Sequence, residues 1–209
     1  SLSLNPETIK KQSGLSIVYT PLHGTGNKLV SRVLREIGFE NVHVVKEQEK
    51  PDGSFPTVKY PNPEEDGSFE LALKLAKEVD GDIILATDPD CDRVGVMIKT
   101  SAGEYYKLTG NQTGALLAHY IISSLQKKGM LKENSFLVDT IVTGKMGQKI
   151  AEKYGVETVS TLTGFKYIAQ QIKNLEDEGD KKFVFGYEES YGFLTGSFVR
   201  DKDGVIASM

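Results

Sequence analysis

The sequence predicts an α/β fold, built as two tandem α/β/α domains with mixed sheets that are related by internal duplication. Apolar runs of strand length alternate with segments of helical periodicity along the chain, which is typical of βαβ units. Two strand patterns separated by the turn residues 101–103 indicate an antiparallel hairpin that closes the first module. The pair Thr20 and Gly24 recurs as Thr140 and Gly144 at an offset of 120 residues, each time between an apolar strand and a helix. These observations favour two related modules over one large sheet.

The size of the chain agrees with a division into two domains. Its 209 residues, of which 39% are hydrophobic, are enough for two domains that each bury a core. We place the boundary after Lys107, which gives domains at 1–107 and 108–209. Chance is the alternative to duplication, because any two strand-turn-helix segments can share a threonine and a glycine.

The elements expected in the first domain follow from the spacing of its apolar residues. A buried strand needs a short apolar run, whereas a helix needs apolar residues three and four apart on one face. The first helix has such a face and is followed by Gly38, a residue that commonly ends helices. The strands are expected at 15–20, 42–45, 82–86, 94–98 and 105–108, and the helices at 27–37 and 69–79.

The same spacing predicts the elements of the second domain. Strands are expected at 136–140, 157–160 and 183–185, and helices at 113–125, before Gly155, and at 167–175. In the first domain, residues 46–66 instead form a long connection whose prolines disfavour both a helix and a central strand. Long loops in compact domains are often functional. A surface loop without a function is the alternative, and the residues of this loop do not decide between the two interpretations.

Composition and charge exclude several classes of protein. The net charge of −4, with 25 basic and 29 acidic residues, argues against a nucleic-acid partner. The apolar runs are too short to span a membrane, and the first residues do not resemble a signal peptide. Cys91 is the only cysteine, so the chain has no internal disulfide. We therefore expect a cytoplasmic protein. The start without methionine and the apolar last residues, 205–209, further suggest a piece of a longer polypeptide.

The most informative motif is Asp88-Pro89-Asp90-Cys91-Asp92-Arg93, which follows the apolar run 83–86. Three carboxylates at alternate positions repel one another and are costly to desolvate, so they need a compensating positive charge. A hard divalent cation such as Mg²⁺ is the simplest candidate, because it prefers oxygen ligands. The guanidinium of Arg93 suits a phosphate, which it can bind through two parallel hydrogen bonds.

Other interpretations of this loop differ in how well they fit. An EF-hand requires glycine at the sixth position and glutamate at the twelfth, where this sequence has Arg93 and Lys99. A haloacid-dehalogenase-type phosphatase leaves the third aspartate and the arginine without a role. A glycosyltransferase D-x-D motif and a solvated acidic turn stay open. We expect Cys91 to be exposed between acidic neighbours, which raises the pKa of a thiol and argues against a nucleophile.

Three further loops follow predicted strands, at the carboxyl ends where α/β sheets bind ligands. Residues 186–192 contain two carboxylates and a hydroxyl between glycines, the groups that sugar recognition uses. Residues 161–166 lead into a helix, so their amides and Lys166 can bind an anion or simply form a cap. The turn 21–26 contains His23 between glycines, where an acid-base role and a structural role are both open.

Taken together, these loops resemble the α-D-phosphohexomutase superfamily, the phosphoglucomutase and phosphomannomutase enzymes. Four segments carry the resemblance in order and spacing: the aspartate loop 88–93, Thr163-Gly164-Phe165-Lys166, the loop 186–192, and Arg200-Asp201-Lys202-Asp203-Gly204. Members of the family have four domains, and this chain resembles the second and third. The resemblance therefore implies that the first and last domains of the same polypeptide are its partners.

The resemblance also implies a reaction and a set of site residues. A phosphoserine in the first domain would exchange its phosphoryl group with a hexose phosphate through a bisphosphosugar, interconverting hexose 1-phosphate and 6-phosphate. Asp88, Asp90 and Asp92 would be metal ligands, and Arg93 would assist phosphoryl transfer beside Mg²⁺. The residues expected to contact the substrate are Glu188 and Ser190 at sugar hydroxyls and Thr163, Gly164 and Lys202 along the cleft.

The chain departs from the family pattern in one important respect. No histidine follows a serine, so the Ser-His-Asn-Pro type motif that provides the phosphoserine is absent. We therefore expect this chain to be inactive by itself. Phosphopentomutase or amino-sugar phosphomutase activity is the alternative within the superfamily. A sugar- or metal-binding module without catalysis and a Mg²⁺-dependent phosphatase are alternatives from other classes.

Overall fold

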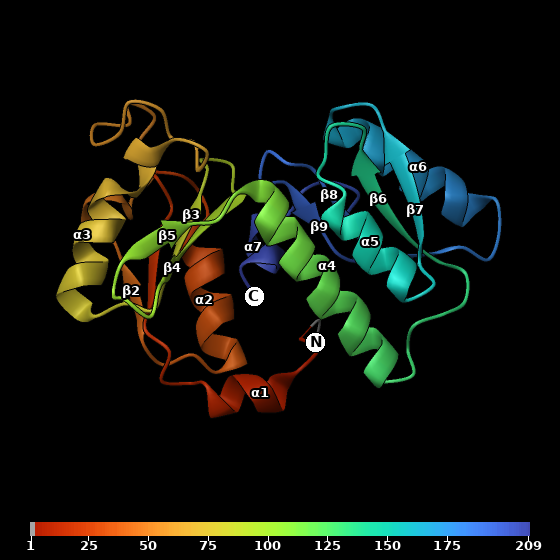
Figure 1. The fold of residues 1–209 in the computed structure, drawn as a ribbon. Coiled ribbons are helices and arrows are strands. Elements are labelled where there is room, and N and C mark those ends of the chain that lie inside the picture. The colour runs from red at the N-terminus through yellow and green to blue at the C-terminus, as the bar shows by residue number, and fades with distance from the viewer. Residues whose placement is uncertain (1–2) are drawn as a thin grey trace. The chain divides into compact units, whose positions relative to one another are not determined.

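The structure is a computed structural model that describes residues 3–209 as two compact units (Figure 1). The first unit consists of the described residues up to Thr109 together with Gly204–Met209, and the second unit is Gly110–Asp203. Each unit contains one mixed sheet between helices. The predicted fold class of two α/β/α domains with mixed sheets is therefore confirmed.

The first unit is built on a five-stranded sheet with the order β2-β1-β3-β4-β5. Strand β1 pairs in parallel with β2 and with the central strand β3, whereas β4 and β5 continue the sheet in antiparallel pairs. The strands are β1 Ile17–Thr20, β2 Val42–Val44, β3 Ile83–Thr87, β4 Val94–Lys99 and β5 Tyr105–Lys107. The helices are α1 Pro6–Lys11, α2 Asn27–Ile37, α3 Glu70–Val79 and α7 Gly204–Ala207, with 3-10 turns η1 Lys46–Gln48 and η2 Asp66–Phe69.

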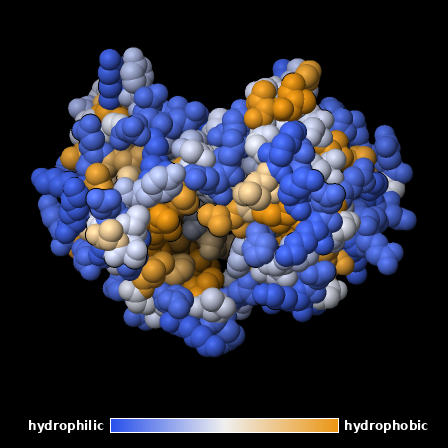
Figure 2. Space-filling model, viewed as in Figure 1, coloured by the Kyte–Doolittle hydropathy of each residue, from blue (hydrophilic) through white to orange (hydrophobic). Residues whose placement is uncertain are grey.

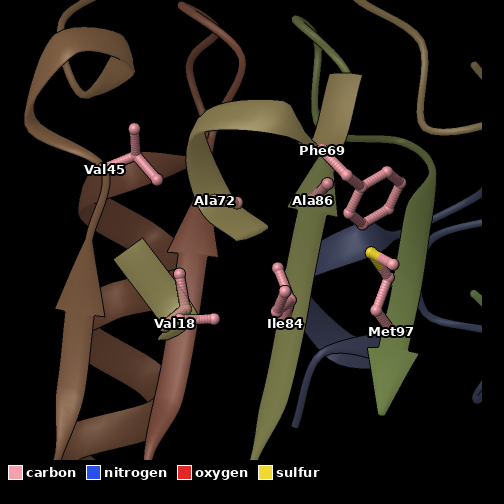
Figure 3. Close-up of a cluster of buried hydrophobic side chains, with 8 residues drawn as sticks. Val18, Val45, Phe69, Ala72, Ile84, Ala86 and Met97 are labelled. Carbon is pink, nitrogen blue, oxygen red and sulfur yellow. The ribbon is translucent and has the colours of Figure 1, made fainter. Parts of the chain in front are cut away.

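Helices α2 and α3 form because each carries an apolar face. Helix α2 ends at Gly38, whose φ of 119° lies in the left-handed region that glycine adopts without strain. Helix α3 packs Ala72 and Ala76 into a cluster of buried side chains from the sheet, shown in Figure 3. That cluster also contains Val18 from β1, Ile84 and Ala86 from β3, Met97 from β4, Val45 and Phe69. The core thereby fixes β3, the strand that leads into the aspartate loop.

The second unit repeats this order in a four-stranded sheet, β7-β6-β8-β9. Its central strand β6 is parallel to β7 and β8, and β9 is antiparallel to β8. The strands are β6 Ser135–Thr140, β7 Glu157–Thr161, β8 Lys182–Tyr187 and β9 Phe193–Leu194. The helices are α4 Gly110–Lys127, α5 Met146–Lys153 and α6 Phe165–Asp177. The shared order agrees with the duplication that the sequence suggests.

The two faces of this sheet are packed differently. On one face, α6 buries Phe165, Ile168 and Ile172 against Phe136 and Val138 of β6. On the other face, the fully buried ring of Tyr187 lies against glycines of two helices, Gly114 of α4 and Gly147 of α5. A side chain at either glycine would overlap the ring. The absence of side chains there lets α4 and α5 approach the end of β8.

The sequence prediction differs from the structure mainly at the ends of elements. Every predicted strand and helix has a counterpart, and the structure adds α1, β9 and α7. Residues 46–66 contain η1 and reach the start of η2, although the prolines disfavour longer helices. The prediction that Cys91 is exposed was wrong: its side chain is buried, because the loop turns inward at a φ of 61° there.

The visible surface of both units is mostly hydrophilic, with smaller hydrophobic areas (Figure 2). Within residues 3–209, no helix combines the length and the apolar character that crossing a membrane requires. The longest of the described helices, α4, has 18 residues, with the hydrophobic side chains of Leu116 and Tyr120 exposed and Ile122 buried.

Candidate metal-binding and substrate-binding residues

The aspartate loop connects the antiparallel strands β3 and β4 at one edge of the first sheet. The ligand atoms of Asp88, Asp90 and Asp92 all lie within 4.8 Å of one another. Asp88 is buried, Asp92 is half-buried and Asp90 is exposed. The structure therefore brings the three predicted metal ligands together in one cluster that opens to solvent on the side of Asp90.

Asp88 is the most constrained of the three carboxylates. Its Oδ1 accepts hydrogen bonds from the backbone amides of Asp92 at 3.1 Å and Arg93 at 2.9 Å, and its Oδ2 accepts one from Arg93 Nε at 2.6 Å. Burial raises the pKa of the Asp88 carboxyl to about 6, while the hydrogen bonds from Arg93 oppose that rise. The guanidinium therefore compensates only in part for the lost hydration of this carboxylate.

Arg93 is surrounded by three acidic side chains. Besides Asp88, it contacts Glu64, whose Oε1 lies 3.2 Å from Nη1, and Asp92, whose Oδ1 lies 3.8 Å from Nε. The sequence did not point to Glu64, which is 29 residues away in a proline-rich loop. The arrangement orients the guanidinium beside the aspartate cluster, where the resemblance places a phosphoryl group.

The residues present fit Mg²⁺. The three side chains offer only hard oxygen donors, and the buried Asp88 still lacks full compensation for its charge. Thiol and imidazole ligands, which would favour zinc, are not among the grouped side chains of residues 3–209. Asp88, Asp90 and Asp92 are accordingly the residues that would hold the ion.

The main chain of the loop is held by two other segments of the first unit. The carbonyl of Pro89 accepts hydrogen bonds from the Thr25 amide at 2.8 Å and the Thr25 hydroxyl at 3.2 Å. The carbonyl of Cys91 accepts one from the amide of Gly204 at 3.0 Å. Neither contact was predicted, because both join segments that are distant in the sequence.

In the second unit, Glu188 and Lys202 form the centre of the predicted substrate-binding residues. Glu188 is only 5% exposed, and its Oε1 lies 3.6 Å from Lys202 Nζ. Burial raises the pKa of the Glu188 carboxyl, whereas Lys202 and a hydrogen bond from Ser190 lower it. Gly192 has no side chain that would overlap Lys202. The structure thus brings Glu188, Ser190 and Lys202 together.

The side chain of Glu189, the neighbouring carboxylate, is hydrogen-bonded inside the second unit. Its Oε2 accepts hydrogen bonds from the hydroxyl of Thr140, the last residue of β6, at 3.2 Å and from that of Thr143, just after the strand, at 3.3 Å. The Glu189 carbonyl also packs so closely on Gly110 that a side chain there would overlap it. These contacts fix the loop 188–192 between β8 and β9, so that Glu188 and Ser190 are presented on a rigid turn.

Thr163 and Gly164 lie on a separate loop between β7 and α6. Gly164 is the N-terminal cap of α6 with a φ of 117°, and Thr163 is exposed. Lys166, in the first turn of the helix, lies with its Nζ 4.9 Å from the ring centre of Tyr167. The amide of Tyr167 already donates to the Gly164 carbonyl at 3.0 Å, so the N-terminus of α6 and Lys166 offer an anion fewer donors than the sequence suggests.

Comparison with known proteins gives one consistent result. Residues 2–103 match the family described as phosphoglucomutase/phosphomannomutase, alpha/beta/alpha domain II, and residues 109–209 match domain III of the same family. Phosphoglucomutase from Staphylococcus haemolyticus is 40% identical over 194 residues, and that from Staphylococcus epidermidis is 41% identical. Each match covers 93% of this chain and 34% of the relative. The chain thus spans about a third of the length of these relatives.

Solved structures are similar in fold over nearly the whole chain. A phosphoglucomutase/phosphomannomutase family protein from Burkholderia thailandensis has a TM-score of 0.73 at 16% identity, with 97% of this chain and 42% of that chain covered. The open form of parafusin, a phosphoglucomutase from Paramecium, has a TM-score of 0.66 at 19% identity, with 98% and 34% covered.

Proposed function

Because the chain belongs to the phosphoglucomutase/phosphomannomutase family, we propose that it carries the metal-binding and sugar-binding domains of an enzyme that interconverts hexose 1-phosphate and hexose 6-phosphate. The observation that carries the proposal is the convergence of Asp88, Asp90 and Asp92 on one hairpin loop. Its relatives at about 40% identity are phosphoglucomutases, which supports this assignment of the reaction.

In this proposal the residues of the first unit act on the phosphoryl group. Asp88, Asp90 and Asp92 hold Mg²⁺, which supplies positive charge to the transferring group when it is bound. Arg93, fixed by Asp88 and Glu64, donates hydrogen bonds to the phosphoryl oxygens. The nucleophilic serine, which becomes phosphorylated and receives the group back from a bisphosphosugar, belongs to another domain of the same polypeptide.

The residues of the second unit bind the sugar phosphate. Glu188 accepts hydrogen bonds from sugar hydroxyls, and Ser190 supplies a neutral donor and acceptor beside it. Lys202 contacts the substrate and lowers the pKa of the Glu188 carboxyl through their ion pair, against the rise that burial causes. Thr163 and Gly164 line the substrate at the N-terminus of α6. Glucose and mannose phosphates present hydroxyls that these residues can bind equally well.

The remaining parts of the proposal concern the polypeptide and its surroundings. We assign the domains to 1–107 and 108–209, although the last six residues contact the first unit. The N-terminal and C-terminal domains of the same polypeptide are the proposed protein partners. Neither nucleic acid nor membrane is proposed as a partner, and the cytoplasm is the proposed location.

The test is a calorimetric titration of the chain with Mg²⁺, together with an assay of hexose phosphate interconversion. We expect weak Mg²⁺ binding, since water fills the positions that the phosphoserine and substrate would occupy, and interconversion at background level. Asp90→Asn removes an exposed ligand without disturbing the core, so the Mg²⁺ affinity should fall roughly tenfold or more, as expected when the charge count of a site is reduced. Glu40→Gln removes one exposed charge elsewhere in the unit and serves as the matched control.

Three outcomes would contradict parts of this proposal. Equal Mg²⁺ binding by the wild-type chain and the Asp90→Asn variant would exclude the aspartate cluster as the site. Clear mutase turnover by the chain would show that the serine need not come from elsewhere. Hydrolysis of a generic phosphomonoester that Asp88→Asn abolishes would favour a phosphatase.

A further inference from the structure

His23 is a buried, hydrogen-bonded side chain to which the proposed reaction gives no role. It is 5% exposed and lies in the turn 21–26, which follows β1. Leu22 and His23 both have a positive φ, 48° and 60°. Side chains other than glycine rarely adopt this conformation, which persists only where surrounding contacts enforce it. The contacts of His23 therefore indicate what the turn is built to hold.

The contacts of His23 tie the turn to residues 46–58. Its ring Nε2 lies 2.8 Å from the hydroxyl of Thr57, which also accepts a hydrogen bond from Gln48 Nε2 at 3.0 Å. Gln48 Oε1 in turn accepts a hydrogen bond from the Thr20 hydroxyl at 2.6 Å. The His23 amide donates to the Gln48 carbonyl, and the His23 carbonyl accepts from the Asp52 amide. Thr57 thus joins the imidazole to a network that begins at the end of β1.

The opposite side of the same turn contacts the aspartate loop. The carbonyl of Pro89 accepts both hydrogen bonds from Thr25. A side chain at Gly24 would overlap the backbone of Pro89, so the two main chains are in direct contact. Pro89 lies between Asp88 and Asp90. The position of this turn consequently sets the position of the backbone from which two of the three clustered carboxylates project.

We propose that His23 is a positioning residue for the metal site: its hydrogen bond to Thr57 fixes the turn 22–25, and this turn fixes Pro89 and the separation of the Asp88 and Asp90 carboxylates. The inference rests on the proposed metal site. It assigns a function to residues 46–58 as well, because they provide the partners of the imidazole. His23 itself does not contact the ion or the substrate and acts only through the backbone of the loop.

The test changes Thr57, an exposed residue whose substitution leaves the core intact. Thr57→Val removes at constant shape the hydroxyl that bonds both His23 and Gln48. We expect the Mg²⁺ dissociation constant to rise at least roughly two- to tenfold, the range typical of one lost hydrogen bond. Thr57→Ser restores the hydroxyl and should recover the wild-type affinity. Thr8→Val makes the same change on the exposed helix α1 and should leave the affinity unchanged.

A second readout needs no metal. In the metal-free protein, Thr57→Val should shift the amide resonances of Asp90, Cys91 and Asp92, whereas Thr8→Val should not. If Thr57→Val does not fold, Thr25→Val tests the second step of the proposal, because it removes one hydrogen bond between the turn and Pro89 from an exposed side chain.

The possible results separate this inference from the proposed function. If the wild-type chain binds no Mg²⁺ but Thr57→Val shifts the loop amides, the metal site is contradicted. The inference that His23 and Thr57 position the loop is then still supported. Unchanged affinity and unchanged loop amides in a folded Thr57→Val variant would overturn the inference and leave the metal site standing. Failure of Thr57→Ser to restore the wild-type values would also overturn it, because the hydroxyl would then not be the group responsible.

Discussion

Glu188 is a carboxylate buried at the end of β8, and its environment makes its charge dependent on Lys202. Burial raises its pKa above the ordinary value, and the ammonium group of Lys202 lowers it. The sequence predicted both residues through the resemblance to a known family. It could not predict that the Glu188 side of the ion pair is buried while Lys202 stays partly exposed, because burial depends on the packing of the whole unit.

The pH dependence of Glu188 follows from the direction of this shift. Because its pKa is higher in the folded state, its contribution to stability is complete below the ordinary pKa of 4.5 and is lost as the pH rises through the folded value. We therefore expect the unfolding temperature of the wild-type chain to fall relative to that of Glu188→Gln as the pH rises above about 4.5.

A carbon-detected NMR titration of the Glu188 carboxyl measures the shift directly. Lys202→Met should raise the pKa further, since it removes the positive charge, whereas Lys202→Arg should keep it close to the wild-type value. A Glu188 carboxyl that titrates at or below the ordinary value in the wild-type chain would contradict the conclusion that burial outweighs the charge of Lys202.

At the same scale, the aspartate loop shows which site residues a sequence can reveal. Asp88, Asp90 and Asp92 occupy alternate positions within five residues of sequence, and this spacing alone predicted the cluster. Glu64, Thr25 and the other groups that hold the loop lie far away along the chain. Their roles depend on how the chain folds back, for which a single sequence contains no local signal.

Among the elements, the packing of α4 and α5 on Tyr187 is the feature most sensitive to a small change. Gly114→Ala adds one methyl group that overlaps the buried ring. The ring is fully buried and cannot move outward freely. We expect the second unit to lose about 1 to 3 kcal/mol of unfolding free energy, as is typical of overpacking.

Urea unfolding, with hydrogen exchange of the β8 amides as the probe, measures this loss of unfolding free energy. Leu116→Ala is the matched control, because Leu116 lies on the same helix with a side chain that is 59% exposed. Its substitution should change the stability by less than about 0.5 kcal/mol. Wild-type stability of Gly114→Ala would mean that α4 is packed less closely on β8 than the structure has it.

The beginning of α4 illustrates where element prediction fails. The apolar pattern predicted a helix at 113–125, whereas the helix is Gly110–Lys127. Glycine and asparagine at 110 and 111 disfavour a helix by propensity. The helix nevertheless extends over them, because Gly110 packs against the carbonyl of Glu189 and the Asn111 side chain accepts a hydrogen bond from Gly144. Tertiary contacts thus outweigh local propensity at this end.

For the whole molecule, the sequence predicted the two related domains but not the path of the last residues. The alternation of strands and helices predicts α/β units with parallel strands, and the two sheets share the strand order seen in the structure. Gly204–Met209 instead joins the first unit. This return of the chain to the first unit depends on the hydrogen bond from the Gly204 amide to the Cys91 carbonyl and on the short helix α7. A four-residue helix has too few apolar positions to be predicted from spacing.

The central claim is that this chain provides the metal-binding and sugar-binding domains of a hexose phosphate mutase. An exchange experiment tests it most directly: the chain replaces the matching segment of the Staphylococcus haemolyticus phosphoglucomutase, to which it is 40% identical. We then measure the conversion of glucose 1-phosphate to glucose 6-phosphate. The chimaera should convert the substrate clearly above background, and Asp90→Asn should reduce kcat/KM at least about a hundredfold, the loss expected when a group that stabilises transition-state charge is removed. A folded chimaera without activity, or one whose activity is unchanged by Asp90→Asn, would contradict the account.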